Sequence, residues 1–393
     1  MDGVKLQDII GKPISGEWGN DDLTGKGVPV LRTTNFTNEG VINYDNVVTR
    51  DIPIKKIAGK YLTQGDILLE KSGGSDKQPV GRVVYFDGEE NKYVFNNFTA
   101  ALRIKDKNVW NSRYLFYALF ANYLKGGTVK YENKTTGLHN LKVDLFIRNF
   151  TIKKIPIELQ EALASKLDLV SRLIDLRKHQ MNDFDELVKS RFVELFGDLD
   201  RPKVKLGECC TINPKKVSDN RLSDNDLMVS FVSMSDVSEN GHVVTCHHKP
   251  YKSVKSGFTY FAEDDVLFAK ITPCMENGKG GIAKGLLNGI GFGSTEFHVL
   301  RPISGLTNSC WLYELTSFPQ FRKAAEINMT GSAGQRRVPA SFLANYRVSL
   351  PPIRLQNQFA DFVQQLDKSK LAVQKSLDEL EILKKSLMQQ YFG

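Results

Sequence analysis

The sequence predicts an α+β protein in which two globular α/β units alternate with two long helices. Three observations lead to this prediction. A short motif occurs twice, as "PIELQ" at residues 156–160 and as "PIRLQ" at residues 352–356. An ungapped offset of 196 residues aligns the segments that follow, up to a terminal Phe-Gly in each copy. In both segments apolar residues recur at steps of three and four, the spacing of one helix face.

The segments before each motif also correspond, which indicates a tandem duplication. Residues 65–71 read "GDILLEK" and residues 264–270 read "DDVLFAK", a strand-like pattern in both copies. Likewise, "TAALR" ends at Arg103 and "FHVLR" ends at Arg301. We therefore expect two globular and two helical regions in alternation, with the boundaries 1–155, 156–200, 201–350 and 351–393.

Each helical segment starts directly after a proline and ends at a glycine, and both residues are typical of helix ends. The apolar stripe is narrow, which suits a single partner helix in a coiled coil. The predicted seam residues are Leu163, Leu167, Val170, Ile174, Met181, Phe184, Leu366, Val373, Leu377 and Leu380. A second interpretation stays open, in which each amphipathic helix packs on its own globular unit.

The positive charge of the chain is concentrated in the globular units. Residues 1–155 contain 23 Lys and Arg against 17 Asp and Glu, and residues 201–350 contain 18 against 13. The whole chain carries a net charge of +8. Two separate basic modules indicate a polyanion that is held at two points, and DNA is the main candidate.

Composition also limits the compartment. No apolar run approaches the ~18 residues that a membrane-spanning helix needs. The N-terminal "MDGVKLQDIIGKPIS" lacks the basic and then apolar layout of a signal peptide. The five cysteines are an odd number in a long chain, which favours reduced thiols. We therefore expect a cytoplasmic protein.

The chain offers no catalytic motif. Adenine methyltransferases carry an Asn/Asp-Pro-Pro-aromatic box, and the nearest approach is "NPKK" at residues 213–216. The sequence has no phosphate-binding G-x-x-x-x-G-K-[ST] motif. Asp66, Glu70 and Lys71 have the wrong spacing for a metal-dependent nuclease, and the second copy has Ala269 in place of Glu70. We predict no catalytic residues.

Possible metal ligands are present but poorly spaced. Residue types that bind zinc occur at Cys246–His248, at Cys274 and in the Cys209–Cys210 pair. Their spacing fits no familiar zinc module, and the first half of the chain has no counterpart. We predict no metal site.

Two globular units, each closed by a proline motif and a heptad helix, resemble the specificity subunits of type I restriction–modification systems. The resemblance covers the whole chain. It depends on "IPIELQ" and "PPIRLQNQF" with their helices, on the "GDIL"-like strand, and on the "TTGLHNL" and "GSAGQRRV" runs before each proline.

The resemblance implies two target recognition domains held apart by two antiparallel coiled-coil helices, with pseudo-two-fold symmetry. It implies that each domain reads one half of a bipartite DNA sequence. It further implies that the chain itself binds no cofactor. Two modification subunits, which carry S-adenosylmethionine, would dock around the helices, and restriction subunits could join them. A pseudo-two-fold axis also matches the approximate dyad of duplex DNA.

Base edges are read by Arg, Lys, Asn, Gln, Ser and Thr side chains on loops and short elements. In the first unit the candidates are Arg32, Lys71, Ser72, Asn97, Lys130, Lys134, Thr135, Thr136 and His139. In the second unit they are Ser233, Lys270, Thr272, Thr295, Ser332, Gln335, Arg336 and Arg337. The alternative function is a scaffold that assembles proteins through two binding domains on a coiled-coil spacer.

Overall fold

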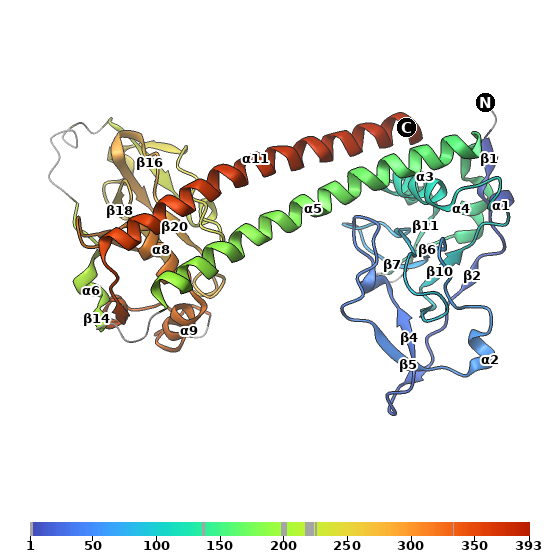
Figure 1. Cartoon of the computed structure of the whole chain (residues 1–393), viewed down its shortest axis with the longest axis horizontal. Helices are drawn as coiled ribbons and strands as arrows, with labels where there is room; N and C mark the ends of the chain where they lie inside the picture. The colour runs from blue at the N-terminus through green and yellow to red at the C-terminus, as the bar shows by residue number, and fades with distance from the viewer. Residues whose placement is uncertain (1–2, 136–137, 198–202, 217–223, 225, 333) are drawn as a thin grey trace. The chain divides into compact units, whose positions relative to one another are not determined.

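The structure is a computed structural model that describes residues 3–135, 138–197, 203–216, 224, 226–332 and 334–393. The chain forms two compact units (Figure 1). Unit 1 consists of residues 1–178 and 375–393, and unit 2 consists of residues 179–374. Each unit therefore contains one globular region and one end of each long helix.

Unit 1 contains two four-stranded sheets. The first has the order β2 (Ile14–Ser15), β10 (Thr99–Leu102), β6 (Ile67–Glu70), β8 (Val83–Tyr85), with antiparallel pairs throughout. The second has the order β3 (Asn20–Asp21), β5 (Val48–Asp51), β4 (Val28–Leu31), β9 (Val94–Phe95), and its β4–β9 pair is parallel. The central strand β6 is buried along its whole length, so its end is a fixed platform for the residues that follow it.

Smaller elements complete unit 1. A three-stranded sheet has the order β11 (Glu132–Thr135), β12 (Leu138–Leu141), β7 (Ser72–Gly74). A two-stranded sheet joins β1 (Gly3–Lys5) to β13 (Thr151–Lys153). The helices of the globular part are α1 (Leu6–Ile9), α2 (Ile54–Ile57), α3 (Ser112–Leu124) and α4 (Val143–Asn149).

Unit 2 repeats this design. Its first sheet has the order β15 (Cys210–Ile212), β22 (Phe297–Pro302), β19 (Val266–Ala269), β20 (Gly280–Ile282). Its second sheet has the order β17 (His248–Pro250), β16 (Met228–Val232), β21 (Ile290–Gly293), β18 (Thr259–Ala262). A two-stranded sheet joins β14 (Lys203–Lys205) to β23 (Arg347–Ser349). The helices are α6 (Leu206–Cys209), α7 (Tyr251–Val254), α8 (Ser309–Ser317), α9 (Pro319–Ile327) and α10 (Ala340–Asn345).

A buried ion pair occupies the same place in both first sheets. Arg103 donates to Asp66 at 2.8 and 2.7 Å, and Arg301 donates to Asp265 at 2.8 and 2.6 Å. Both carboxylates are almost fully buried, so their charge requires the paired guanidinium. The matching sheets and ion pairs confirm the predicted duplication.

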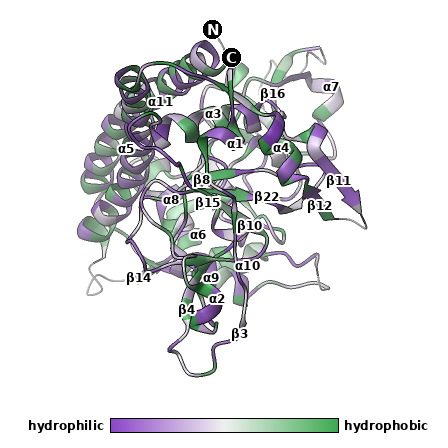
Figure 2. Cartoon of the chain, turned by 90° about the vertical axis from the view of Figure 1, so that its right-hand side faces the viewer, coloured by the Kyte–Doolittle hydropathy of each residue, from purple (hydrophilic) through white to green (hydrophobic). Residues whose placement is uncertain are grey.

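The two long helices are α5 (Ile157–Phe196) and α11 (Ile353–Phe392). Each starts one residue after the motif proline and ends one residue before the predicted glycine. Hydrophobic and hydrophilic residues alternate around both helices (Figure 2), as expected for amphipathic helices.

The helices pair within each unit. In unit 1, Val170 and Ile174 of α5 form a buried cluster with Leu377 of α11, which partly buried Leu380 extends. In unit 2, the ring of Phe359 on α11 lies 5.5 Å from that of Phe192 on α5. Early residues of one helix thus contact late residues of the other, which makes the pairing antiparallel.

The ends of the helices also pack on the globular cores. Leu167 is fully buried in the main core of unit 1, and Leu163 is packed against the same core. Leu366 packs against the main core of unit 2. Val373 is buried, whereas Met181 and Phe184 are only partly buried. Both sequence interpretations therefore describe part of the helices: coiled-coil pairing around Val170 and core packing towards the ends.

Candidate nucleic-acid interface

The predicted contact residues of unit 1 gather where strand β6 ends. The backbone N–H of Lys71 donates to the carbonyl of Phe98 at 2.7 Å, and its carbonyl accepts from Leu141 N–H at 2.8 Å. Ser72 follows on β7 and pairs with Asn140 of β12. The exposed Asn97 precedes Phe98. The structure thus brings Lys71, Ser72 and Asn97 together.

Lys71 is partly buried at this junction. Its ammonium donates to the hydroxyl of Ser15 at 2.8 Å. Burial lowers the pKa of Lys71 below its ordinary value, with a smaller contribution from the charge of Lys60. A cation with incomplete solvation has more to gain from an anionic partner than one in free solution.

The hairpin β11–β12 contains the further candidates Lys134 and His139, and the side chain of each contacts a carboxylate. The ammonium of Lys134 lies 2.7 Å from Asp76, and this bond lowers the pKa of Asp76 and raises that of Lys134. His139 is buried, with its Nδ1 3.1 Å from a carboxylate oxygen of Glu132. His139 therefore positions the hairpin and is not presented at its surface. Thr136 and the side chain of Thr135 lie outside the described residues.

The remaining candidates of unit 1 lie in separate segments. Arg32 precedes a 3₁₀ turn and donates to the carbonyl of Asn46 at 3.2 Å. Lys130 is exposed, and its ammonium lies 5.2 Å from the centre of the Tyr131 ring. Arg82 donates both to the carbonyl of Thr33 at 3.0 Å and to Glu70 at 3.1 Å, which places the Arg32 segment near the end of β6.

Unit 2 presents the same backbone arrangement. The N–H of Lys270 donates to the carbonyl of Glu296 at 2.9 Å, and its carbonyl accepts from Val338 N–H at 2.9 Å. Lys270 therefore occupies the position that Lys71 has in unit 1. The N–H of Thr272 donates to the carbonyl of Arg336 at 3.0 Å, which brings the loop 330–337 against the end of β19.

The other candidates of unit 2 border this junction. Thr295 is exposed beside Glu296, and Ser233 follows Val232, whose carbonyl accepts from Ser294 N–H at 3.1 Å. Ser332 and Gln335 are exposed in the loop 330–337. The hydroxyl of Ser233 is occupied by Asp236 at 2.6 Å. Backbone hydrogen bonds thus join the segments that carry these residues around the end of β19.

The two adjacent arginines of this loop differ. Arg337 forms a bidentate pair with Glu296 at 2.9 and 2.7 Å, which lowers the pKa of that carboxyl. Arg336 has a longer contact, 3.7 Å to Glu276. The two side chains are about equally exposed, but Arg337 is committed to Glu296, whereas Arg336 is held by the weaker contact.

The carboxylates that contact Lys134, His139, Arg336 and Arg337 were not predicted from the sequence. Asp76, Glu132, Glu276 and Glu296 were not among the candidates, although Glu132 and Glu296 each lie within two residues of one. A buried pair was also missed: Glu70 accepts two bonds from Arg82, both at 3.1 Å. For Glu132 the available signal was its spacing of two residues from both Lys130 and Lys134.

The residues considered for other chemistry have structural partners. Cys209 and Cys210 are buried, and burial raises the pKa of both thiols, to about 11 and 12. Their Sγ atoms lie 3.5 and 3.4 Å from backbone carbonyls of α6 and the residue before it. Within the described residues, no group of three or more His, Cys, Asp or Glu side chains is placed to hold a metal. Among the same residues, no helix is long and apolar enough to cross a membrane.

The fold and the two matched junctions define a duplicated α+β protein with one candidate face in each repeat. The chain belongs to the family described as type I restriction modification DNA specificity domain, which it matches over residues 2–183 and 200–381. The two matched ranges correspond to the two repeats, and they confirm the family resemblance in the sequence.

Similar proteins were found among curated proteins and solved structures. The chain is 41% identical over 174 residues to the type I restriction enzyme EcoAI specificity subunit of Escherichia coli, covering 43% of this chain and 28% of the relative. It is 43% identical over 152 residues to the EcoEI specificity subunit of the same organism, covering 38% and 25%. Each match thus spans about a quarter of the relative's length.

Two solved structures share the fold over the whole chain. The S subunit of a type I restriction–modification system from M. genitalium aligns with a TM-score of 0.59 at 14% identity, covering 100% of this chain and 96% of that chain. A chain from a study of complex assembly and conformational transition of the type I R-M system aligns with a TM-score of 0.57 at 14% identity, covering 100% and 97%.

Proposed function

We propose that this chain is the sequence-reading subunit of a type I restriction–modification complex, in which each globular domain reads one half of a bipartite DNA target. The observation that carries the proposal is the shared junction of Lys71 and Lys270, whose backbone groups have equivalent partners in the two domains. Two DNA-reading domains built on one scaffold require a basic position that is present in both and neighbouring loops that differ in sequence.

Comparing the two junctions separates two kinds of contact. The lysine is the same in both domains, so it suits the phosphate backbone, which is the same in every sequence. The neighbouring positions differ: Asn140 precedes Leu141 in unit 1, whereas Arg337 precedes Val338 in unit 2, and His139 similarly corresponds to Arg336. His139 is buried and Arg337 is held by Glu296, so among these four positions Arg336 is the candidate for a base contact that unit 1 lacks.

The chain acts in this proposal without catalysis of its own. Adenine methylation and its S-adenosylmethionine belong to modification subunits, two of which dock along α5 and α11, and restriction subunits join the same complex. The helices act as the spacer between the reading domains. The relatives are named as specificity subunits, and the cytoplasm is the compartment in which such a complex meets DNA.

A domain exchange tests the proposal. Residues 201–350 would be replaced by the equivalent segment of a related subunit, and methylated sites would be mapped after assembly with the cognate modification subunit. We expect one half of the recognised sequence to change and the other to stay. A change in both halves, or in neither, contradicts the two-reader proposal. The scaffold alternative predicts assembly of the partners without any sequence-dependent DNA binding.

A further inference from the structure

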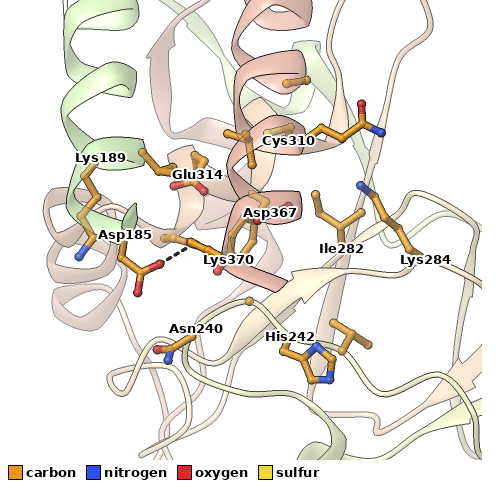
Figure 3. Close-up of a pocket in the computed structure, with 18 of the residues that line it drawn as sticks. Asp185, Lys189, Asn240, His242, Ile282, Lys284, Cys310, Glu314, Asp367 and Lys370 are labelled. Carbon is orange, nitrogen blue, oxygen red and sulfur yellow. Dashed lines mark hydrogen bonds and ion pairs between the residues drawn. The ribbon is translucent and has the colours of Figure 1, made fainter. Parts of the chain in front are cut away.

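Unit 2 contains a cleft of about 1030 Å³ between its globular part and the two long helices. Its lining comes from α5, α8, α11 and the loop around residues 239–243 (Figure 3). Five carboxylate residues and three lysines line it. This acidic balance is unusual in a chain with a net charge of +8, and it is unfavourable for a DNA backbone.

Glu314 of α8 points into this cleft (Figure 3) and is partly buried. Within the described part of the chain, no hydrogen bond or ion pair reaches its carboxylate. The nearby Lys370 is engaged with Asp185 of α5 at 2.6 Å. Burial raises the pKa of Glu314 to about 7, against the opposing charges of Lys370 and Lys189. The carboxylate therefore lacks a cation of its own.

The internal repeat shows what occupies the same place in unit 1. There, Arg113 of α3 donates to Asp168 of α5 at 2.9 and 3.1 Å. The hydroxyl of Tyr117 donates to the same carboxylate at 2.5 Å. The guanidinium of Arg113 also lies 4.0 Å from the centre of the Tyr85 ring. Unit 1 thus fills this site with its own arginine, which lies over the Tyr85 ring and shares its Nε–H between the two oxygens of Asp168.

The alignment of the two sites follows from matching bonds. Asn111 caps α3 and donates its N–H to Gln160 on α5, and Asn308 caps α8 and donates its N–H to Gln356 on α11. Counting from these anchors, Cys310 replaces Arg113 and Glu314 replaces Tyr117 in unit 2. In the same way, Gln364 replaces Asp168 and Ile282 replaces Tyr85. The arginine is thus replaced by a short thiol, and the carboxylate moves from the long helix, where Gln364 replaces Asp168, to α8, where Glu314 replaces Tyr117.

A second cation is lost at the same place. Lys384 of α11 lies in unit 1 near Asp168 and Asp175, and burial lowers its pKa. The corresponding residue of α5 in unit 2 is Val188, which lines the cleft. In unit 2, Cys310 and Val188 thus replace Arg113 and Lys384, whereas Lys284 and Lys370 replace Asp87 and Ile174. Lys370 is engaged by Asp185, and Glu314 has no hydrogen bond or ion pair among the described residues.

We propose that this cleft receives an arginine side chain of the modification subunit, whose guanidinium pairs with Glu314 beside Cys310 in the space that Arg113 fills in unit 1. The proposal deepens the proposed function and rests on it for the identity of the partner. The planar guanidinium fits because the repeat already uses one there, with a carboxylate at its edge. Asymmetry follows, since Arg113 occupies the corresponding place in unit 1.

The guanidinium site is tested first without any partner. Nα-acetyl-L-arginine methylamide would be titrated into the full chain by NMR, with the citrulline analogue as the uncharged control of equal shape. We expect saturable binding of the arginine probe only, weakened on the order of tenfold by Glu314→Gln, since the variant loses a charge-assisted hydrogen bond. Equal binding of the citrulline analogue, or no arginine-dependent shifts at the cleft, overturns the proposal.

Cys310→Arg supplies the decisive variant, because it restores the residue of unit 1. The new side chain should occupy the cleft, abolish probe binding and raise the melting temperature. The matched control is Cys246→Arg, since Cys246 is exposed and does not line the cleft. Unchanged probe binding by the folded Cys310→Arg variant contradicts the proposal.

The partner is tested by assembly with the cognate modification subunit. Both Cys310→Arg and Glu314→Gln should weaken assembly at least tenfold, whereas Cys246→Arg should not. If the probe binds but both variants assemble normally, the modification subunit is not the occupant and the proposal fails. If the domain exchange fails while probe and assembly behave as expected, the proposed DNA reading fails and the arginine site stands.

Discussion

The side-chain oxygen of Gln160 accepts the backbone N–H of Asn111 at 2.9 Å, and its amide donates to the carbonyls of Val109 and Ile155 at 3.0 and 2.9 Å. Gln356 repeats all three bonds in unit 2. Both glutamines are fully buried. The last residue of the repeated motif therefore ties the first turn of each long helix to its own globular domain.

Replacing Gln160 by alanine should destabilise unit 1 by about 2–4 kcal/mol, because three hydrogen bonds are lost and a buried N–H is left unpaired. Urea unfolding of the full chain measures this change. Gln365→Ala on the exposed face of α11 is the control and should change stability by less than about 0.5 kcal/mol. Equal effects of the two substitutions would show that the buried amide has no anchoring role.

Arg336→Ala should relax recognition of one half-site, because Arg336 is held less tightly than its neighbour and one bidentate base contact contributes about 1–3 kcal/mol. Arg337→Ala should instead release Glu296 and lower the thermal stability of unit 2, with similar losses for all DNA sequences. Binding of the assembled complex to duplexes varied in each half-site measures both effects. If Arg337→Ala alone altered specificity, the assignment of the two arginines would be reversed.

Lys71→Ala and Lys270→Ala should weaken binding to all sequences and each reduce the slope of log K against log salt by about 1, as expected for a phosphate contact. The control is Lys107→Ala. Lys107 is exposed and follows the C-terminal end of β10, whereas Phe98 of the junction precedes the N-terminal end of this strand. A changed sequence preference in either variant would identify that lysine as a base contact.

Glu314→Gln should stabilise unit 2 increasingly as the pH rises. The pKa of Glu314 is about 7 in the folded chain, above its ordinary value, so the folded state binds this proton more tightly than the unfolded state. The stability of the wild type should therefore fall as the pH rises from about 4.5 to 7, because over this range the unfolded chain has released the proton that Glu314 still binds in the folded chain. The variant has no carboxyl at this position and should not show this fall.

The groups that face Glu314 are Lys189, Lys370, Asp185 and Asp367, and they are present in wild type and variant alike. Because the residue is only partly buried, the gain at pH 8 should be limited to about 1–2 kcal/mol. Melting temperatures of both proteins from pH 5 to 8 provide the measurement. Parallel pH profiles would show that Glu314 titrates as an ordinary carboxyl.

The bounds of the two long helices could be predicted from local sequence alone. Proline at the start, glycine at the end and a continuous heptad stripe determine α5 and α11 to within a residue or two, because helix bonds join neighbours in the chain. The repeat "PIELQ" and "PIRLQ" likewise exposed the duplication. The same pattern could not show that Leu167 packs in the core of unit 1 while Val170 pairs with α11, since both lie on one stripe.

The sequence by itself determined the duplicated architecture, the long helices and the basic segments around Lys71 and Arg336, because periodicity, repeats and local charge are properties of residues close in the chain. Only the tertiary structure decided that His139 is buried against Glu132, that Arg337 is held by Glu296, and that Glu314 faces an open cleft. Each of these depends on a contact between residues far apart in the chain or on burial, and both arise when the chain is packed.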